Sequence, residues 1–256
     1  MNNEQTEAIK ANRNGLILSP IAGKGGCGKT TFLAYLIAQL PPSIKPRVYD
    51  FEEGGTTGLS RYCPESKKLK LHKDSDVQRS DLDRLIDDFD DDPDGLAIVD
   101  LPANSGFEFL RWITAVPWLE IAERGIEIMM FASATDDSDS LRLSLPWVEA
   151  LQTKVKYILV ENQCLGSTFQ QWKFSKQGIS FTEIYKPTIV RFPKIPAEWA
   201  IVLENQGKTI FDPLHGVPGF PKLGTMDRSR VDRLRAAVRS ELRPVLSLLE
   251  RQVVVK

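Results

Sequence analysis

Two lysines flank a glycine-rich stretch near the start of the chain, and their spacing predicts a phosphate-binding loop. The pattern G-x-x-x-x-G-K-[ST] is matched by Gly23, Gly28, Lys29 and Thr30. In such a loop the glycines let consecutive backbone N–H groups surround phosphate oxygens, while the lysine and the hydroxyl serve the phosphate and Mg²⁺. A second lysine, Lys24, stands at the start of the loop, where this chemistry does not require one.

The residues on either side of this loop predict a strand before it and a helix after it. Residues 16–21 form a short apolar run, and residues 31–40 have the apolar spacing of a helix that ends at Pro41. The loop would then lie at a helix N-terminus, where the backbone dipole favours an anion. A chance match in an ordinary loop is the alternative, but the correct order of strand and helix makes it rare.

Two aspartates end later apolar strands and are candidates for the rest of this site. Asp50 lies in the predicted strand 47–51, and Asp100 lies in the predicted strand 96–101. In phosphate-loop proteins a carboxylate at the end of an apolar strand holds Mg²⁺ directly or through its water. Because the carboxyl ends of parallel strands meet at one edge of a sheet, we expect both aspartates to converge on the loop.

Further apolar runs predict the fold class. Residues 126–132, 155–160 and 188–192 are expected to be strands, and residues 138–151 a helix. Strands that alternate with helices at this spacing indicate an α/β fold, a mostly parallel twisted sheet with helices on both faces.

Length and composition favour a single domain over residues 1–256, in which 42% of the residues are hydrophobic. A terminal helix is expected at about 226–250, interrupted or kinked near Pro244. The net charge of −1 gives the whole molecule no strong attraction to nucleic acid or anionic membrane. Its three cysteines are too few and too scattered for a disulfide framework, and the polar start has no apolar secretory core, so a cytoplasmic location is expected.

The segment from Lys24 to Thr31 resembles the deviant Walker A motif of the ParA/MinD family of phosphate-loop ATPases. The additional lysine near the start of the loop is the hallmark of that family. The resemblance implies a homodimer that forms on ATP binding, in which two subunits enclose two ATP molecules and Lys24 reaches the partner's nucleotide. A cation supplied in this way would stabilise charge on the transferring phosphoryl group, as an arginine finger does.

The resemblance also implies roles for individual residues. Lys29 would hold the β- and γ-phosphates, and Thr30 with Asp100 would hold Mg²⁺. Asp50 and Glu52 would orient the attacking water, although Glu52 replaces the aspartate of the family and its longer side chain predicts slow hydrolysis. The implied nucleotide-binding residues are Gly25, Gly26, Cys27, Gly28, Lys29, Thr30, Thr31 and Asn162, the last at a position that touches adenine in relatives. The segments 195–200 and 204–210 resemble the late loop and helix that close over the base.

Relatives of this type position cargo, so the resemblance implies a partition ATPase that acts in plasmid segregation or conjugative transfer and is stimulated by an adaptor protein. Non-specific DNA binding is expected from a basic terminal helix, and it would associate the protein with the nucleoid. Arginines near one face of that helix are Arg228, Arg235, Arg239 and Arg243. The alternative is an ordinary solvated helix with salt bridges.

Other functions stay open. One is a nucleotide-dependent scaffold in which hydrolysis is negligible because of Glu52. Another is a MinD-like membrane-associated ATPase, which is disfavoured because the chain ends in valines rather than in an amphipathic helix. A phosphotransferase that acts on a small molecule is the third, but Lys24 would then have no role.

Overall fold

The computed structural model describes residues 15–21, 24–51, 58–73, 76–77, 79–103 and 105–253. Its main sheet has seven strands in the order β3-β2-β6-β1-β7-β8-β9, and every neighbouring pair is parallel. The strands are β1 Gly15–Pro20, β2 Arg47–Asp50, β3 Lys67–Lys68, β6 Leu96–Asp100, β7 Ile126–Ala134, β8 Lys156–Asn162 and β9 Thr188–Phe192. A short antiparallel pair, β4 His72–Lys73 and β5 Asp76–Val77, forms a separate sheet.

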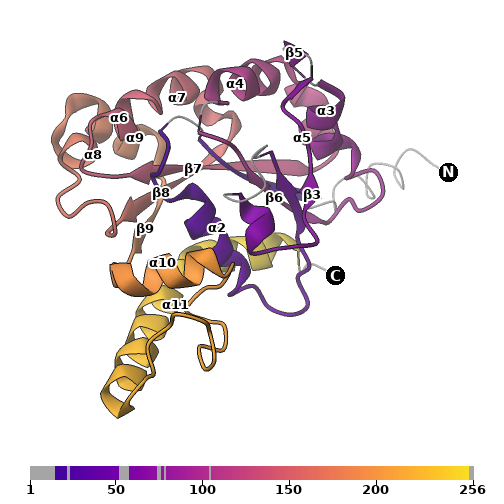
Figure 1. Ribbon diagram of the computed structural model, residues 1–256. Helices are drawn as coiled ribbons and strands as arrows, with labels where there is room; N and C mark the ends of the chain where they lie inside the picture. The colour runs from indigo at the N-terminus through magenta and orange to yellow at the C-terminus, as the bar shows by residue number, and fades with distance from the viewer. Residues whose placement is uncertain are drawn as a thin grey trace.

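Helices cover both faces of the main sheet (Figure 1). One face carries α2 Lys29–Ile37, α10 Ala197–Asn205 and α11 Thr225–Val253. The other face carries α3 Arg79–Asp87, α4 Gly106–Ala115, α5 Trp118–Glu123, α6 Asp139–Arg142, α7 Leu145–Leu151, α8 Gln170–Phe174 and α9 Lys176–Tyr185. Two 3₁₀ turns, η1 Leu59–Arg61 and η2 Gln152–Lys154, complete the described elements.

The alternation of side chains along the strands explains this layered arrangement. In β7, Met129 and Phe131 are buried under α2 and its neighbours, while Met130 and Ala132 are buried on the opposite face. A strand whose two faces are both apolar must be covered on both sides. The predicted α/β class with a parallel sheet is therefore confirmed.

The predicted helix over 138–151 is two helices. The chain breaks between α6 and α7, and Pro146 lies in the first turn of α7. Proline has no N–H to donate to the carbonyl four residues earlier, so it favours the first turn of a helix, and a new helix begins here.

The terminal helix, by contrast, continues through Pro244 without interruption. Both Pro244 and Ser240, the residue whose carbonyl loses its helical donor, are exposed, so water can serve that carbonyl. The helix packs against the sheet through a stripe of buried side chains, namely Val231, Val238, Leu242, Val245 and Leu249. No helix in the described part of the chain combines the length and apolar character that a membrane crossing requires.

Candidate nucleotide site

The glycine-rich loop joins β1 to α2, as the sequence predicts, and its backbone requires glycine at two positions. Gly26 and Gly28 have φ angles of 68° and 86°, a left-handed conformation that residues with a Cβ atom rarely adopt. At Gly28 a Cβ atom would also lie 2.3 Å from Nδ2 of Asn162. Glycine at this position therefore allows both the turn and the close approach of β8.

Asn162, at the end of β8, holds the loop in place. Its Nδ2 donates a hydrogen bond to the carbonyl of Cys27 (3.1 Å), and its Oδ1 accepts one from the backbone N–H of Cys164 (3.0 Å). The side chain is 4% exposed. Asn162 thus positions the phosphate loop in the described structure, and its contact with a base stays a prediction.

Lys29 is the first residue of α2, and its ammonium group has no anionic partner among the described residues. Nζ donates to the carbonyl of Lys24 at 3.0 Å and lies 3.9 Å from Sγ of Cys27. The residue is only 6% exposed. A buried cation needs a compensating anion, and a helix N-terminus favours one at the same place. The loop therefore fits a phosphate group.

Thr30 and Asp100 bring two oxygen ligands together beside the loop. The hydroxyl of Thr30 donates to Oδ2 of Asp100 at 2.8 Å, and Asp100 is 2% exposed at the end of β6. Mg²⁺ prefers hard oxygen ligands and usually binds one or two protein groups together with the phosphates. The donor set therefore fits Mg²⁺, and the role of these two residues as its ligands stays a prediction.

Asp50, at the end of β2, lies opposite Asp100 in the strand register and is 1% exposed. Its Oδ2 accepts a hydrogen bond from the backbone N–H of Ser60 (2.7 Å), and a Cβ atom on Gly58 would lie 2.5 Å from its carboxylate. Asp50 therefore holds the start of η1. Its predicted role with the attacking water is not tested by these contacts, and Glu52 lies outside the described residues.

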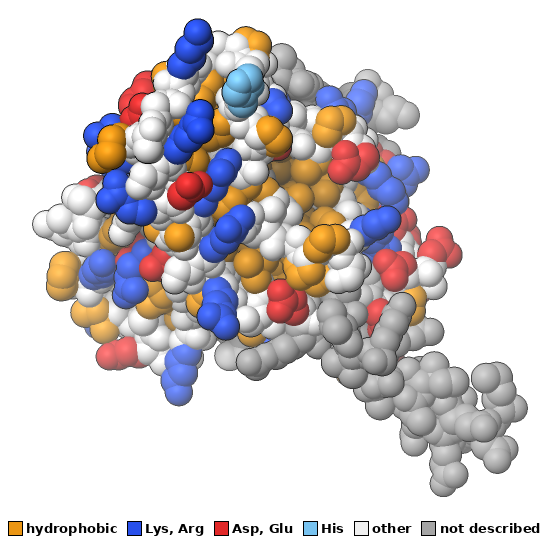
Figure 2. Space-filling model, turned by 90° about the horizontal axis from the view of Figure 1, so that it is seen from below, with side chains coloured by type: hydrophobic (Ala, Val, Ile, Leu, Met, Phe, Trp, Pro, Cys, Tyr) orange, Lys and Arg blue, Asp and Glu red, His pale blue; other side chains and the backbone are white. Residues whose placement is uncertain are grey.

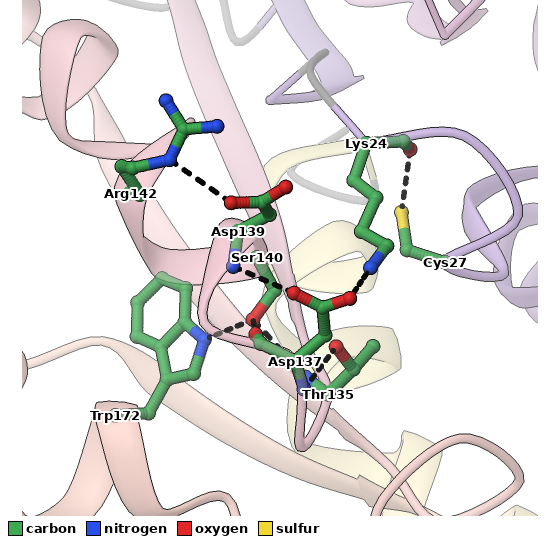
Figure 3. A network of polar contacts seen from close by, with 8 residues as sticks. All are labelled: Lys24, Cys27, Thr135, Asp137, Asp139, Ser140, Arg142 and Trp172. Atoms are coloured by element: carbon green, nitrogen blue, oxygen red, sulfur yellow. Dashed lines mark hydrogen bonds and ion pairs between the residues drawn. The ribbon is translucent and has the colours of Figure 1, made fainter.

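Lys24 forms an ion pair with Asp137, in the loop that follows β7 (Figure 3). Oδ1 of Asp137 also accepts a hydrogen bond from the backbone N–H of Asp139 (2.8 Å), and its own N–H donates to the hydroxyl of Thr135 (3.3 Å). The side chains of Lys24 and Asp137 are 30% and 47% exposed. Asp137 was missed by sequence reasoning, because Asp50 and Asp100 end their strands whereas Asp137 lies three residues after β7.

A cavity of about 180 Å³ opens beside the loop, where the sequence predicts that the late loop and helix close over a base. Glu204 and Lys208 lie at its wall, and Arg61 pairs with Glu204 at 3.2 Å. Burial raises the pKa of Tyr62, another lining residue, to about 12, so its hydroxyl stays protonated. The lining residues are Gly26, Gly28, Thr31, Tyr35, Tyr62, Asn162, Cys164, Leu165, Phe192, Ile195, Ala200, Leu203, Glu204 and Lys208.

The predicted arginine face of α11 is partly used within the chain. Arg235 donates from Nε to the carbonyl of Ile210 (2.6 Å) and from a terminal nitrogen to that of Asp212 (3.1 Å). Arg239 donates to the side chain of Gln39 at 2.8 Å. The other two predicted members, Arg228 and Arg243, are exposed. Figure 2 views the molecule from the side of α10 and α11, where basic side chains are spread over the surface with acidic ones between them.

Comparisons with known proteins give little beyond the fold. No protein-family model matches the chain, and no curated protein matches it. Among solved structures, the crystal structure of FlhF complexed with GMPPNP/Mg(2+) is similar, with a TM-score of 0.41 and 14% sequence identity over 72% of this chain and 69% of that chain. A likeness this distant concerns the arrangement of the chain alone.

Proposed function

We propose that this chain is a ParA-like ATPase that binds ATP with Mg²⁺, dimerises around the nucleotide and positions cargo. One observation carries the nucleotide part of the proposal, namely the buried ammonium of Lys29 at the start of α2 without an anionic partner among the described residues. Such an arrangement is costly to maintain unless an anion such as phosphate binds there. The second lysine at the start of the loop supports the more specific, dimeric part.

Each described residue of the site then has a task in binding. The backbone of Gly25 to Gly28 and the ammonium of Lys29 hold the phosphates, and Thr30 with Asp100 hold the cation. The cavity beside the loop receives the base. Bound Mg²⁺ supplies positive charge that neutralises the phosphoryl oxygens, while the protein residues fix the orientation.

Lys24 is the residue proposed to act across the dimer interface. In the described subunit it pairs with Asp137, and both side chains are partly exposed. An ion pair in contact with water is weak, because solvent screens it and the flexible side chains lose entropy. Lys24 can therefore exchange this partner for the phosphates of a second subunit at small cost.

Binding to DNA is proposed for the exposed arginines of α11. Arg228, Arg233 and Arg243 are exposed and make no ion pair with any described residue. Two such helices in a dimer would present a basic surface to the DNA backbone, so binding would be independent of sequence and would weaken with salt. We propose that this surface attaches the dimer to DNA during plasmid partition or conjugative transfer, and that an adaptor protein stimulates hydrolysis.

The experiment that tests this function measures mass by light scattering and retention on DNA, each with ATP, GTP, ADP or no nucleotide. We expect the wild type to dimerise and to retain DNA with ATP. Lys24→Ala should bind nucleotide but remain monomeric, whereas Lys29→Ala should lose binding. Lys45→Ala, a change at an exposed lysine outside the site, is the matched control.

Two outcomes would change the proposal. A wild-type protein that stays monomeric with every nucleotide would refute the shared site. A protein that dimerises with GTP but not with ATP would refute adenine specificity. Dimerisation with ATP but no phosphate release, even with DNA and a cognate partner, would identify a nucleotide-dependent scaffold instead of an ATPase.

A further inference from the structure

A second cavity lies at the opposite end of the sheet from the phosphate loop. It has a volume of about 320 Å³ and is built by α5, the start of β7 and η2. Gly15 of β1 pairs with Ile126 in its wall, whereas Pro20, just before the loop, pairs with Phe131. The two pairs are five positions apart along β1, which corresponds to about 16 Å. The cavity is therefore distinct from the nucleotide site.

The wall of this cavity combines apolar side chains with two donors, Trp118 and Lys154, and one carboxylate, Glu127. The lining residues are Trp118, Ile121, Ala122, Gly125, Ile126, Glu127, Ile128 and Lys154. The carboxylate of Glu127 is already paired with Lys156 at 2.7 Å. Lys154 places its ammonium 5.6 Å from the centre of the Trp118 ring and forms no ion pair with any described residue.

The indole N–H of Trp118 is the second donor. Its Nε1 atom is buried, and no described residue accepts a hydrogen bond from it. An indole nitrogen can only donate, and buried donors without an acceptor are rare in folded proteins. The atom is not in contact with water in this structure, so an acceptor group of a ligand would supply the missing partner once the groups that cover the atom move aside.

The backbone that brings Lys154 to the cavity is strained. Gln152, where α7 ends and η2 begins, has a φ of 48° and a ψ of −123°. This conformation is unfavourable for a residue with a Cβ atom, and such strain concentrates at functional sites. The turn ends α7 at this point. Lys154 follows two residues later, with its ammonium over the Trp118 ring.

We propose that this cavity binds a small carboxylic acid with an aromatic or branched apolar body. The carboxylate would lie between the ammonium of Lys154 and the indole N–H of Trp118, and the apolar body would contact Ile121, Ile126 and Ile128. A volume of about 320 Å³ is at the lower end of the range for small-molecule sites. The site requires no nucleotide, so it goes beyond the proposed function and does not depend on it.

The test uses the full chain without nucleotide, labelled with ¹⁵N, and follows the side-chain indole resonances of its five tryptophans. Trp118→Phe identifies the Trp118 signal by its loss. We expect 3-phenylpropionate to shift this signal in a saturable manner. The matched neutral probe, 3-phenylpropionamide, should bind at least about tenfold more weakly, because it cannot pair with the ammonium.

Variants of two exposed lysines, one in the cavity wall and one outside it, separate this site from general attraction of anions. Lys154→Gln should weaken binding of 3-phenylpropionate by about tenfold, and Lys45→Gln should change it by less than about twofold, because Lys45 does not line the cavity. Thermal unfolding of each variant shows whether it is folded. The proposal is overturned by a Trp118 signal in the wild type that does not move with millimolar acid. It is equally overturned if the acid and the amide bind alike, or if folded Lys154→Gln binds as the wild type does.

Discussion

Lys24 and Asp137, 113 residues apart in the sequence, are joined by an ion pair between the phosphate loop and the loop after β7. In the proposed function Lys24 contacts the nucleotide of a neighbouring subunit. In the structure described, it is instead paired with a carboxylate of its own subunit. The carboxylate of Asp137 also accepts a hydrogen bond from the backbone N–H of Asp139, and this bond fixes the orientation of the carboxylate toward Lys24. Dimerisation through Lys24 would have to break this contact.

Asp137→Asn should consequently lower the ATP concentration needed for dimerisation. The pair is partly exposed, so its removal is worth at most about 1 kcal/mol, which corresponds to a shift of about two- to fivefold in the midpoint. Light scattering over an ATP titration measures this shift.

Asp139→Asn is the matched control for this experiment. Asp139 lies two residues away and pairs with Arg142 at 2.9 Å instead of with Lys24. Its variant should shift the midpoint less than Asp137→Asn does, because Asp139 attracts Lys24 through space but forms no ion pair with it. If Asp137→Asn raised the midpoint or abolished dimerisation, Asp137 would be a component of the assembled site and not a competitor for the lysine.

Lys29→Met should separate nucleotide binding from stability, because the wild-type ammonium is buried without an anionic partner among the described residues. Methionine fills similar space without charge, so the nucleotide-free variant should unfold at the same temperature as the wild type or a higher one. Its affinity for ATP should fall by more than about 100-fold, since the charge-assisted contacts with phosphate are lost.

Differential scanning fluorimetry with and without ATP and Mg²⁺ measures both effects in one experiment. The wild type should be stabilised by the nucleotide, as expected when a ligand binds only the folded state, while Lys29→Met should not respond. A variant that is strongly destabilised without nucleotide would show that Lys29 supports the fold and would remove the main argument for a phosphate site.

The positions of the strands and of the loop could be predicted because they depend on local patterns. The apolar run 16–21 became β1, and the pairing of Thr30 with Asp100 follows once parallel strands place their carboxyl ends together. The same rule places the loop after the predicted strand 126–132 at this edge of the sheet, and Asp137 lies in that loop. Its pairing with Lys24 could not be predicted, because it depends on how two loops far apart in the sequence meet.

The arginine face of α11 shows where a local pattern gives an incomplete answer. Position 235 lies between Val231 and Val238 on the stripe that packs against the body of the protein. Helical spacing alone places Arg235 beside the other arginines, but the buried valines decide which side faces inward. The repeat of valines at 231, 238 and 245 was visible in the sequence. It would have placed Arg235 on the side of the helix that packs against the rest of the protein.

Arg235→Ala should therefore affect stability more than DNA binding. Its side chain donates to the carbonyls of Ile210 and Asp212, and their loss should cost about 1–2 kcal/mol in the free energy of unfolding. Urea denaturation measures this cost. A variant as stable as the wild type would mean that these two contacts do not hold the segment before α11.

The double variant Arg228→Ala/Arg233→Ala should weaken DNA binding and leave stability almost unchanged. Both side chains are exposed, so the free energy of unfolding should change by less than about 0.5 kcal/mol. Retention on DNA should fall for every sequence, and the slope of log affinity against log salt should decrease by about 2 per subunit. Unchanged retention would leave α11 as a solvated helix and would assign any DNA binding to another surface.

Asp136 supplies a pH-dependent contribution to stability. The backbone N–H groups of Phe169, Ser167 and Thr168 donate to its carboxylate and lower its pKa from 3.8 to about 2. Since the pKa is lower in the folded state, the charged form favours folding. The contribution is complete above the ordinary pKa of an aspartate and is lost as the pH falls through 3.8 toward 2.

Asp136→Asn should accordingly be less stable than the wild type near neutral pH, and the difference should shrink as the solution is acidified. Urea denaturation of both proteins between about pH 7 and pH 3 measures the convergence, because the linkage slope of this one group operates only in the acidic part of that range. Asparagine keeps an acceptor oxygen but not the charge, so the comparison isolates the charge. Two parallel curves over the whole range would mean that the N–H groups of the 167–169 loop stabilise the side chain equally in both forms.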